Sequence, residues 1–209
     1  MLAIVCPGQG SQTPGFLAPW LELPSVAGHL ASLSEIAGID LTAHGTTSDE
    51  ETIKDTAVAQ PLIVAAGLVA AKSLFDVELN TLPVILAGHS VGEITASALA
   101  GVLTEKEAMT FVRERANSMA AAAAVTPTGM SAVVGGDPAE VLAAIEAAGA
   151  TPANVNGAGQ TVAAGTFEQL KALAENPPAK ARVIPLKVAA CGLRVNWRRR
   201  LPGFSRMRR

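Results

Sequence analysis

A serine is flanked by glycines in the sequence Gly-His-Ser-Val-Gly at residues 88–92. A short apolar run precedes this motif and an alanine-rich run follows it, which predicts a strand, a tight turn at Ser90 and then a helix. A serine on such a turn is exposed as a nucleophile, and Gly88 and Gly92 remove side chains that would collide across it. The Val91 amide is expected at the helix start, where an N–H without a helical partner can hold an acyl oxyanion. A plain turn of small residues is the alternative interpretation.

A second glycine-rich loop, residues 7–12, follows an apolar run at residues 2–6 that is typical of a buried parallel strand. The loop lacks the spacing of a phosphate-binding loop, because Thr13 stands where a third glycine is needed and no Gly-Lys-Thr/Ser sequence follows. Its glycines instead let the backbone approach a ligand, with Gln9 supplying an amide donor beside it. A turn without a binding role fits these residues equally well.

Helices are expected around these two loops. Apolar residues at helical spacing predict a surface helix over residues 25–36, whereas the polar residues 46–55 predict a loop. Pro61 is expected to open a longer apolar helix, because the first helical turn tolerates its missing N–H. Gln60 then stands at the entrance of this helix, where it can face the site.

A capping-box pattern at residues 104–107 predicts the start of a further helix, which carries Arg113 and Arg115. Arginine on a helix of this kind is usually solvated or paired with an acid, and the residues alone favour that interpretation for both side chains. His29 and His44 are isolated in the sequence and are expected to be structural or to face solvent.

The pattern changes after residue 126, where short strands and helices follow in the order βαββαβ, typical of a ferredoxin-like unit. The chain is therefore expected to have a larger α/β part at 1–126, a small part at 127–188 and a basic tail at 189–209. A small unit of this kind would wall one side of a cleft, where ligands commonly bind. The predicted strands are 130–134, 154–156, 161–164 and 182–188, and the predicted helices are 138–148 and 167–175.

The composition, with 49% hydrophobic and 16% charged residues in a chain of 209, excludes general disorder and allows a sizeable core. No apolar run reaches about 18 residues and no basic segment precedes the first strand, so we expect neither a membrane span nor a signal peptide, but a cytoplasmic protein. Cys6 and Cys191 fit no metal or redox spacing and are interpreted as incidental thiols, and no metal site is expected.

The charge is unevenly distributed along the chain. Residues 194–209 hold seven of the 16 basic residues and none of the 18 acidic ones, which leaves nine basic residues against 18 acidic ones before this tail. A nucleic-acid-binding arm is one interpretation of the tail, but we favour a protein that binds no nucleic acid.

Several further motifs occur together in one order along the chain. They closely resemble the malonyl-CoA:acyl-carrier-protein transacylases of fatty-acid and polyketide synthesis, over residues 1–189. The resemblance implies an α/β-hydrolase-like larger subdomain, incomplete here, with an inserted ferredoxin-like βαββαβ subdomain. The motifs are Pro-Gly-Gln-Gly-Ser-Gln at 7–12, Val-Ala-Gln-Pro at 58–61, Gly-His-Ser-Val-Gly-Glu at 88–93, Arg115, and Asn-Val-Asn-Gly-Ala-Gly-Gln at 154–160.

The resemblance also implies the chemistry. In that family a serine takes malonyl from coenzyme A, which is a substrate and not a tightly bound cofactor, and passes it to the phosphopantetheine thiol of acyl carrier protein. The match gives this role to Ser90 and places the oxyanion at the backbone amides of Gln9 and Val91. Arg115 matches the arginine that pairs with the malonyl carboxylate, which suits a planar guanidinium. The remaining matched site residues are Gln60 and Asn156 for substrate binding and His89, with the two motif glycines, as structural residues of the turn.

The chain departs from the family near residue 190. Members of the family carry a catalytic histidine after the last strand of the small subdomain, whereas no histidine follows Ser90 here, and they continue well beyond residue 209. A shifted reading frame or an altered end would explain both departures and the basic tail. Without its base the serine is expected to be feebly active or inactive, since removing a triad histidine costs on the order of a million-fold in turnover.

Two competing functions remain. A thioesterase or esterase would use the same motif but requires an acid and then a histidine downstream, and that histidine is absent from this sequence. A catalytically silent module that still binds coenzyme A or carrier protein is the alternative from another class.

Overall fold

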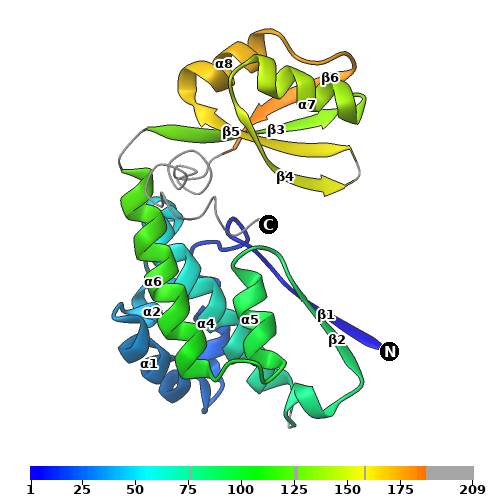
Figure 1. Cartoon of the computed structure of the whole chain (residues 1–209). Helices are drawn as coiled ribbons and strands as arrows, with labels where there is room; N and C mark the ends of the chain where they lie inside the picture. Colours follow the sequence, from blue (N-terminus) through cyan, green and yellow to red (C-terminus); the bar gives the residue numbers. More distant parts are fainter. Residues whose placement is uncertain (76, 125–126, 158, 187–209) are drawn as a thin grey trace, which may run out of the picture. The chain divides into compact units, whose positions relative to one another are not determined.

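The computed structural model describes residues 1–75, 77–124, 127–157 and 159–186, and it is an α/β protein (Figure 1). The chain divides into two compact units, Met1–Ser118 and Met119–Arg209. The basic tail expected at 189–209, with Cys191, lies outside the described residues.

Two parallel strands carry the loops that the sequence singles out. Strand β1, Leu2–Cys6, pairs with β2, Val84–Gly88, so that Cys6 and Gly88 are partners at the carboxyl ends of both strands. Helix α5, Gly92–Leu99, packs against both strands. The expected strands are therefore present and parallel.

The expectation that these strands are buried is wrong. Val5 is 71% exposed and Ile85 is 53% exposed, and the burial of β2 alternates along the strand. The physical reason is that the sheet has only two strands within the described residues and α5 covers one of its faces.

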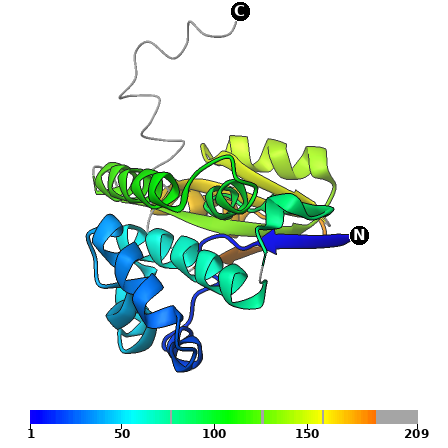
Figure 2. The same cartoon turned by 90° about the horizontal axis from the view of Figure 1, so that it is seen from below.

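The core of the first unit is helical (Figure 2). Helix α4 packs against α1, α2, α3 and α5, and its buried residues include Leu62, Val64 and Leu68. The helices are α1 (Val26–Ala37), α2 (Leu41–Thr46), α3 (Glu50–Lys54), α4 (Thr56–Leu74) and α6 (Glu105–Ala123), with short 3-10 turns at Ala18–Glu22 and Leu79–Thr81. The predicted surface helix over 25–36 corresponds to α1, and its buried residues recur at the predicted spacing.

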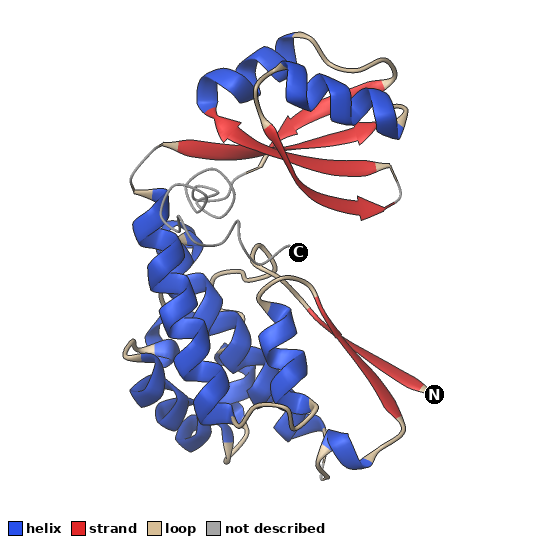
Figure 3. Ribbon diagram, in the orientation of Figure 1, coloured by secondary structure: helices blue, strands red, loops and turns tan. Residues whose placement is uncertain are grey.

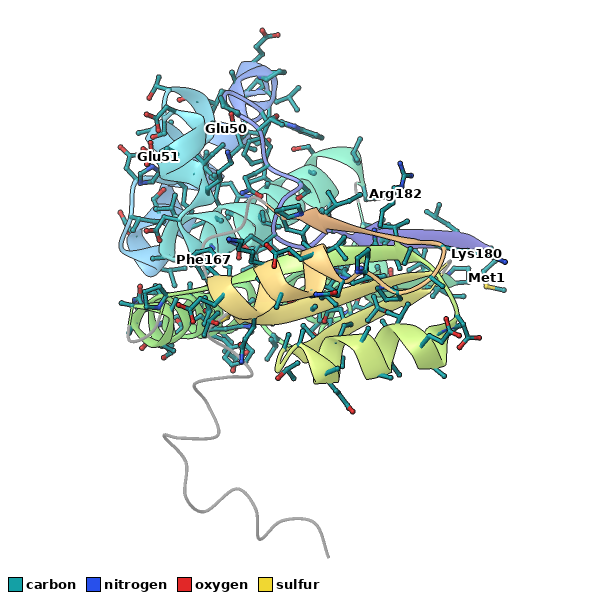
Figure 4. All side chains as sticks on the ribbon, turned by 90° about the horizontal axis from the view of Figure 1, so that it is seen from above. Met1, Glu50, Glu51, Phe167, Lys180 and Arg182 are labelled. Atoms are coloured by element: carbon teal, nitrogen blue, oxygen red, sulfur yellow. The ribbon has the colours of Figure 1, made fainter. Side chains whose placement is uncertain are left out.

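The polar segment 46–55 is not the loop that the sequence predicts, because most of it lies in α2 and α3. Asp40 accepts a hydrogen bond from the Ala43 N–H and Asp49 accepts one from the Thr52 N–H, so each short helix begins with a capping carboxylate. Glu50 and Glu51 extend outward from the first turn of α3 (Figure 4), where negative charge favours a helix.

Helix α4 begins five residues before Pro61, which corrects the expected start. Asp55 caps the helix by accepting a hydrogen bond from the Ala57 N–H, so Pro61 lies inside the helix. Its missing N–H would have bonded to a carbonyl in the preceding turn, and the cap together with burial of the helix offsets that loss.

By length and composition α4 is also the one described helix that could cross a membrane. Half of its most apolar window is buried, in contact with the other helices of the unit, and core helices of water-soluble proteins meet the same criterion.

The segment between α5 and α6 contains the capping box predicted at residues 104–107. Gly101 has a φ of 73° after the end of α5. The Thr104 N–H donates to Glu107 Oε2 at 2.8 Å and the Glu107 N–H donates to Thr104 Oγ1 at 3.2 Å, which is the reciprocal bonding of a capping box. The predicted start of this helix is thus confirmed.

The second unit is a four-stranded antiparallel sheet in the order β4-β5-β3-β6, and its helices α7 and α8 cover one face (Figure 3). Val133, Ile145 and Leu173 lie in the core between sheet and helices. The elements follow the predicted order βαββαβ: β3 (Thr128–Gly135), α7 (Pro138–Ala147), β4 (Thr151–Gly157), β5 (Gln160–Thr166), α8 (Phe167–Glu175) and β6 (Ala181–Pro185). Asp137 caps α7 by accepting hydrogen bonds from the Ala139 and Glu140 N–H groups.

Candidate active site

Ser90 lies on the turn between β2 and α5, where the sequence predicts it. Its φ of 55° is in the left-handed region, which is uncommon for a residue with a side chain and typical of a nucleophile on a sharp turn. The residue is exposed, and the following residue, Val91, caps α5 and is buried. The strand, turn and helix therefore present the hydroxyl outward.

The turn has no room for side chains at its two glycines. A Cβ at Gly88 would overlap the backbone of Gly92 and Glu93, and a Cβ at Gly92 would overlap the backbone of Cys6 and Pro7. The turn can therefore close only with glycine at both positions, because backbone atoms cannot move aside as a flexible side chain can.

Two backbone N–H groups, one in the turn and one in the glycine-rich loop, have no acceptor among the described residues. Within the described residues, neither the Gln9 N–H nor the Val91 N–H donates to a protein acceptor. The His89 N–H donates to the Cys6 carbonyl at 3.0 Å, which joins the turn to the end of β1 and to the loop that carries Gln9. N–H groups that have no protein acceptor can donate hydrogen bonds to an acyl oxyanion.

The sequence suggested that the Gln9 side chain is a free amide donor beside the loop, but the structure shows it hydrogen-bonded within the protein. Its Nε2 donates to the Lys54 carbonyl at 3.4 Å and to Thr56 Oγ1 at 3.3 Å. These bonds tie the loop to the junction of α3 and α4, so the side-chain Nε2 of Gln9 is engaged within the protein. The residues at this junction carry no motif, and the sequence analysis missed them.

Arg115 is the charged group at the hydroxyl. Its Nη2 donates to Ser90 Oγ at 3.2 Å and its Nη1 donates to Oε1 of Gln60, a residue that is 1% exposed in α4. Gln60 thus lies within the helix and not at its entrance. Burial lowers the pKa of Arg115 from its ordinary value, and the negative charge of Glu93 opposes that shift. The sequence analysis gave no role to Glu93, although it follows the serine by three residues.

Arg113 differs from Arg115 although the two share a helix. Its Nη1 donates to the Ile36 carbonyl at 2.8 Å, near the carboxyl end of α1, and its guanidinium pairs with Glu114 at 3.0 Å. This placement agrees with the structural interpretation from the sequence. Residues two apart on a helix point to different faces, so the two guanidinium groups meet different partners.

The two remaining predicted residues differ in their surroundings. His89 is exposed, with its ring Nδ1 beside Gly8, so the ring is not buried beneath the turn. Asn156 belongs to the second unit, where its Nδ2 donates to Gln160 Oε1 at 2.8 Å across the β4–β5 hairpin.

Two further kinds of chemistry in the described part of the chain would require a metal site or a reactive thiol. No group of three or more His, Cys, Asp or Glu residues there could hold a metal ion. Cys6 is buried below the turn, and burial raises the pKa of its thiol, which disfavours the reactive thiolate.

The chain is an α/β protein with an exposed serine on a sharp strand-to-helix turn. Residues 3–190 match the acyl transferase domain family, and the chain belongs to this family.

Within this family the chain is similar to malonyl CoA-acyl carrier protein transacylases. It is 54% identical over 190 residues to that protein of Mycobacterium tuberculosis, a match that covers 90% of this chain and 63% of the relative. It is 34% identical over 195 residues to the Escherichia coli protein, with 90% and 62% covered. The chain thus spans less than two thirds of the length of these relatives.

Solved structures give the same likeness. The crystal structure of the transacylase from Mycobacterium tuberculosis superposes with a TM-score of 0.87 at 54% identity, covering 91% of this chain and 64% of that one. A malonyl-transacylase in complex with a type II polyketide acyl-carrier protein superposes with a TM-score of 0.78 at 30% identity, covering 90% and 63%.

Proposed function

We propose that the chain transfers a malonyl group from a coenzyme A thioester to the phosphopantetheine thiol of an acyl carrier protein, through an ester on Ser90. The observation that carries this proposal is the hydrogen bond from Arg115 Nη2 to Ser90 Oγ, which joins a carboxylate-binding group to an exposed nucleophile. The names of the similar proteins, and the carrier-protein complex among the similar structures, support the same donor and acceptor.

The reaction would proceed in two halves. Ser90 Oγ attacks the thioester carbonyl, a C–O bond forms, and the C–S bond breaks to release the coenzyme A thiolate. The thiol of the carrier protein then attacks the serine ester, and the serine oxygen leaves. In both halves the carbonyl oxygen becomes an oxyanion, which the Gln9 and Val91 N–H groups would stabilise.

Selection of the acyl group would rest on Arg115. Its planar guanidinium can grip a carboxylate with two hydrogen bonds, and burial makes that charge costly to leave without an anion. An acetyl group has no carboxylate, so it would gain nothing from this contact. The negative charge of Glu93 favours the charged guanidinium and partly opposes the effect of burial on the Arg115 pKa.

The rate of this chain as printed is expected to be low. Ser90 needs a base to take its proton, and the sequence has no histidine after it. His89 adjoins the nucleophile, but neighbouring residues on a tight turn direct their side chains differently, so we do not assign it this role. Removing the histidine of a catalytic triad costs on the order of a million-fold in turnover.

Several finer features belong to the same proposal. The sheet order β4-β5-β3-β6 supports a ferredoxin-like small subdomain, spanning 127–188, beside an α/β-hydrolase-like part at 1–126. Asn156 would bind substrate from the small subdomain, and coenzyme A would act as substrate with no tightly bound cofactor. We place the protein in the cytoplasm, where carrier-protein-dependent synthesis is expected.

Intact-protein mass spectrometry after incubation with malonyl-CoA tests the proposal. A malonyl adduct that maps to Ser90 and moves to added carrier protein supports transfer, whereas free malonate without a carrier product supports hydrolysis. The Ser90→Ala variant should form no adduct. Ser97→Ala is a matched control, because Ser97 lies in α5 and its hydroxyl donates to the Glu93 carbonyl at 2.7 Å. Binding of coenzyme A with neither product would indicate a silent binding module.

A further inference from the structure

We propose that Gln60 sets the length of the dicarboxylic acyl group that Ser90 accepts, by holding the Arg115 guanidinium at a fixed distance from the serine hydroxyl. This inference rests on the proposed acyl transfer at Ser90. Gln60 acts through Arg115, so it is a positioning residue.

Gln60 is a buried side chain that is hydrogen-bonded to Arg115. It is 1% exposed in the middle of the helical core, and its Oε1 accepts a hydrogen bond from Arg115 Nη1. Breaking a hydrogen bond to a buried amide oxygen costs free energy, which favours keeping the guanidinium on Gln60.

The other end of the same guanidinium lies against the nucleophile, because Nη2 is 3.2 Å from Ser90 Oγ. The guanidinium is planar and rigid, so fixing Nη1 on Gln60 also fixes Nη2. Arg113, two residues earlier in α6, reaches the Ile36 carbonyl instead. The contact with Gln60 is thus the anchor that we assign to the Nη1 end of the Arg115 guanidinium.

A fixed guanidinium next to the hydroxyl favours short diacids. In a malonyl ester one methylene separates the two carbonyl carbons, so the carboxylate stays close to the serine oxygen and can reach Nη2 without displacing it. A succinyl ester carries its carboxylate one carbon–carbon bond further out. It must fold back or push the guanidinium off Gln60, which leaves a buried amide oxygen without that donor.

The test compares acylation of Ser90 by malonyl-CoA, succinyl-CoA and acetyl-CoA, with initial rates taken from intact mass. In the unaltered chain malonyl should be faster than succinyl. Gln60→Met keeps most of the side-chain volume but removes the acceptor, and it should lower the malonyl-to-succinyl rate ratio about tenfold, near the least discrimination that one methylene supports. An equal loss of both rates, with an unchanged ratio, would overturn the inference.

Two further variants separate positioning from folding. Gln60→Glu keeps an acceptor for Nη1, so it should retain the length preference while lowering both diacyl rates by neutralising Arg115. Thr95→Val is the matched control, because Thr95 is equally buried and, among the described residues, its hydroxyl has no partner. It should leave the ratio unchanged, and a changed ratio in this control would count against a specific role of Gln60.

A measurement independent of transfer keeps the two proposals apart. Phenylglyoxal modifies arginine side chains, and a bound diacid should protect Arg115 from it. Free malonate should protect at a lower concentration than succinate. In this complex one malonate carboxylate would contact Arg115 and the other would occupy the place of the thioester carbonyl. In Gln60→Met this difference should vanish. Absence of any Ser90 adduct even after prolonged incubation would contradict the proposed transfer. Equal protection by the two diacids in the unaltered chain would instead contradict the role of Gln60.

Discussion

Gly92 is the residue on which the turn at Ser90 depends most directly, because a Cβ there would meet the Cys6 and Pro7 carbonyls at the end of β1. We expect Gly92→Ala to lower the free energy of unfolding by about 3 kcal/mol, since the strand and the helix must separate to admit a methyl group. Urea denaturation of the full chain measures this change.

Gly28→Ala is the control for this prediction. Gly28 lies in α1, and no heavy atom lies within 4 Å of its added Cβ. Alanine is the better helix former, so the variant should gain about 1 kcal/mol. Equal effects of the two substitutions would show that the packing around the turn is looser than the contacts indicate.

Arg115→Ala addresses the choice of acyl group. The variant removes the donor to Ser90 Oγ and the charge that would pair with a malonyl carboxylate. We expect Ser90 malonylation to fall about a hundredfold or more while acetylation is kept or rises, because a broken buried pair costs about 3–5 kcal/mol. Parallel time courses with the two thioesters measure the ratio, and an equal fall in both would contradict the assignment.

The contacts of single residues could be predicted only where they lie close together in the sequence. The turn around Ser90 was predictable because the glycine spacing and the flanking runs determine it. The meeting of Arg115 with Ser90 came from the resemblance, since the arginine is 25 residues away on another helix. Two hydrogen bonds, from Arg115 to Gln60 and from the Gln9 side chain to the Lys54 carbonyl, depend on the packing of several helices. No local sequence pattern predicts them.

At the scale of elements, a hydrogen bond between side chains joins α1 to α6. His29 Nε2 lies 2.9 Å from Glu105 Oε2, with the two side chains 11% and 41% exposed. The hydrogen bond with His29 lowers the pKa of Glu105 from its ordinary value of 4.5, with the charges of His29 and Lys72 adding to the effect and burial opposing it.

A carboxyl whose pKa is lower in the folded state stabilises the fold above its unfolded pKa, and this contribution is lost as the pH falls through the folded pKa. Glu105→Gln should therefore lower the free energy of unfolding by about 0.5 kcal/mol at pH 7, a small value because the pair is partly exposed. The difference should shrink below pH 4.5 and vanish below the folded pKa. Urea titrations at several pH values measure it, and a difference that grows toward acid would contradict the sign.

The contact of α4 with α5 contains an unusual polar atom. Thr95 Oγ1 is buried and, within the described residues, has no hydrogen-bond partner, while its methyl group faces Gly67. Thr95→Val keeps the shape and removes the unsatisfied hydroxyl, so it should raise the free energy of unfolding by about 1 kcal/mol. A fall in stability on urea denaturation would indicate that the hydroxyl is satisfied in solution.

The boundaries of elements were less predictable than their types. Asp55 and Pro61 are both compatible with a helix start. The structure uses the aspartate, whose carboxylate accepts the Ala57 N–H in the first turn. Strand β1 was correctly placed at Leu2–Cys6, but its burial was not, since burial depends on how many strands and helices surround it. Local chemistry determines where an element can begin, and packing determines which beginning is used.

At the scale of the whole molecule, two separate groups of buried apolar residues stabilise the chain. One surrounds α4 and includes Leu62, whereas the other lies between the sheet and helices of the second unit and includes Ile145. The sequence predicted this change of pattern from the order of strands and helices. Because each unit has its own core, the two need not unfold together.

Leu62→Ala and Ile145→Ala test this independence. Both side chains are fully buried, so each substitution should cost about 2–5 kcal/mol in the unit that contains it. In a urea titration followed by hydrogen exchange and mass spectrometry, Leu62→Ala should expose the amides of α4 at lower urea while leaving those of β3 and β5 unchanged, and Ile145→Ala should do the reverse. If either variant lowered the protection of both units equally, the chain would unfold as one cooperative body, and the stability of the site at Ser90 would then depend on the second core as much as on the first.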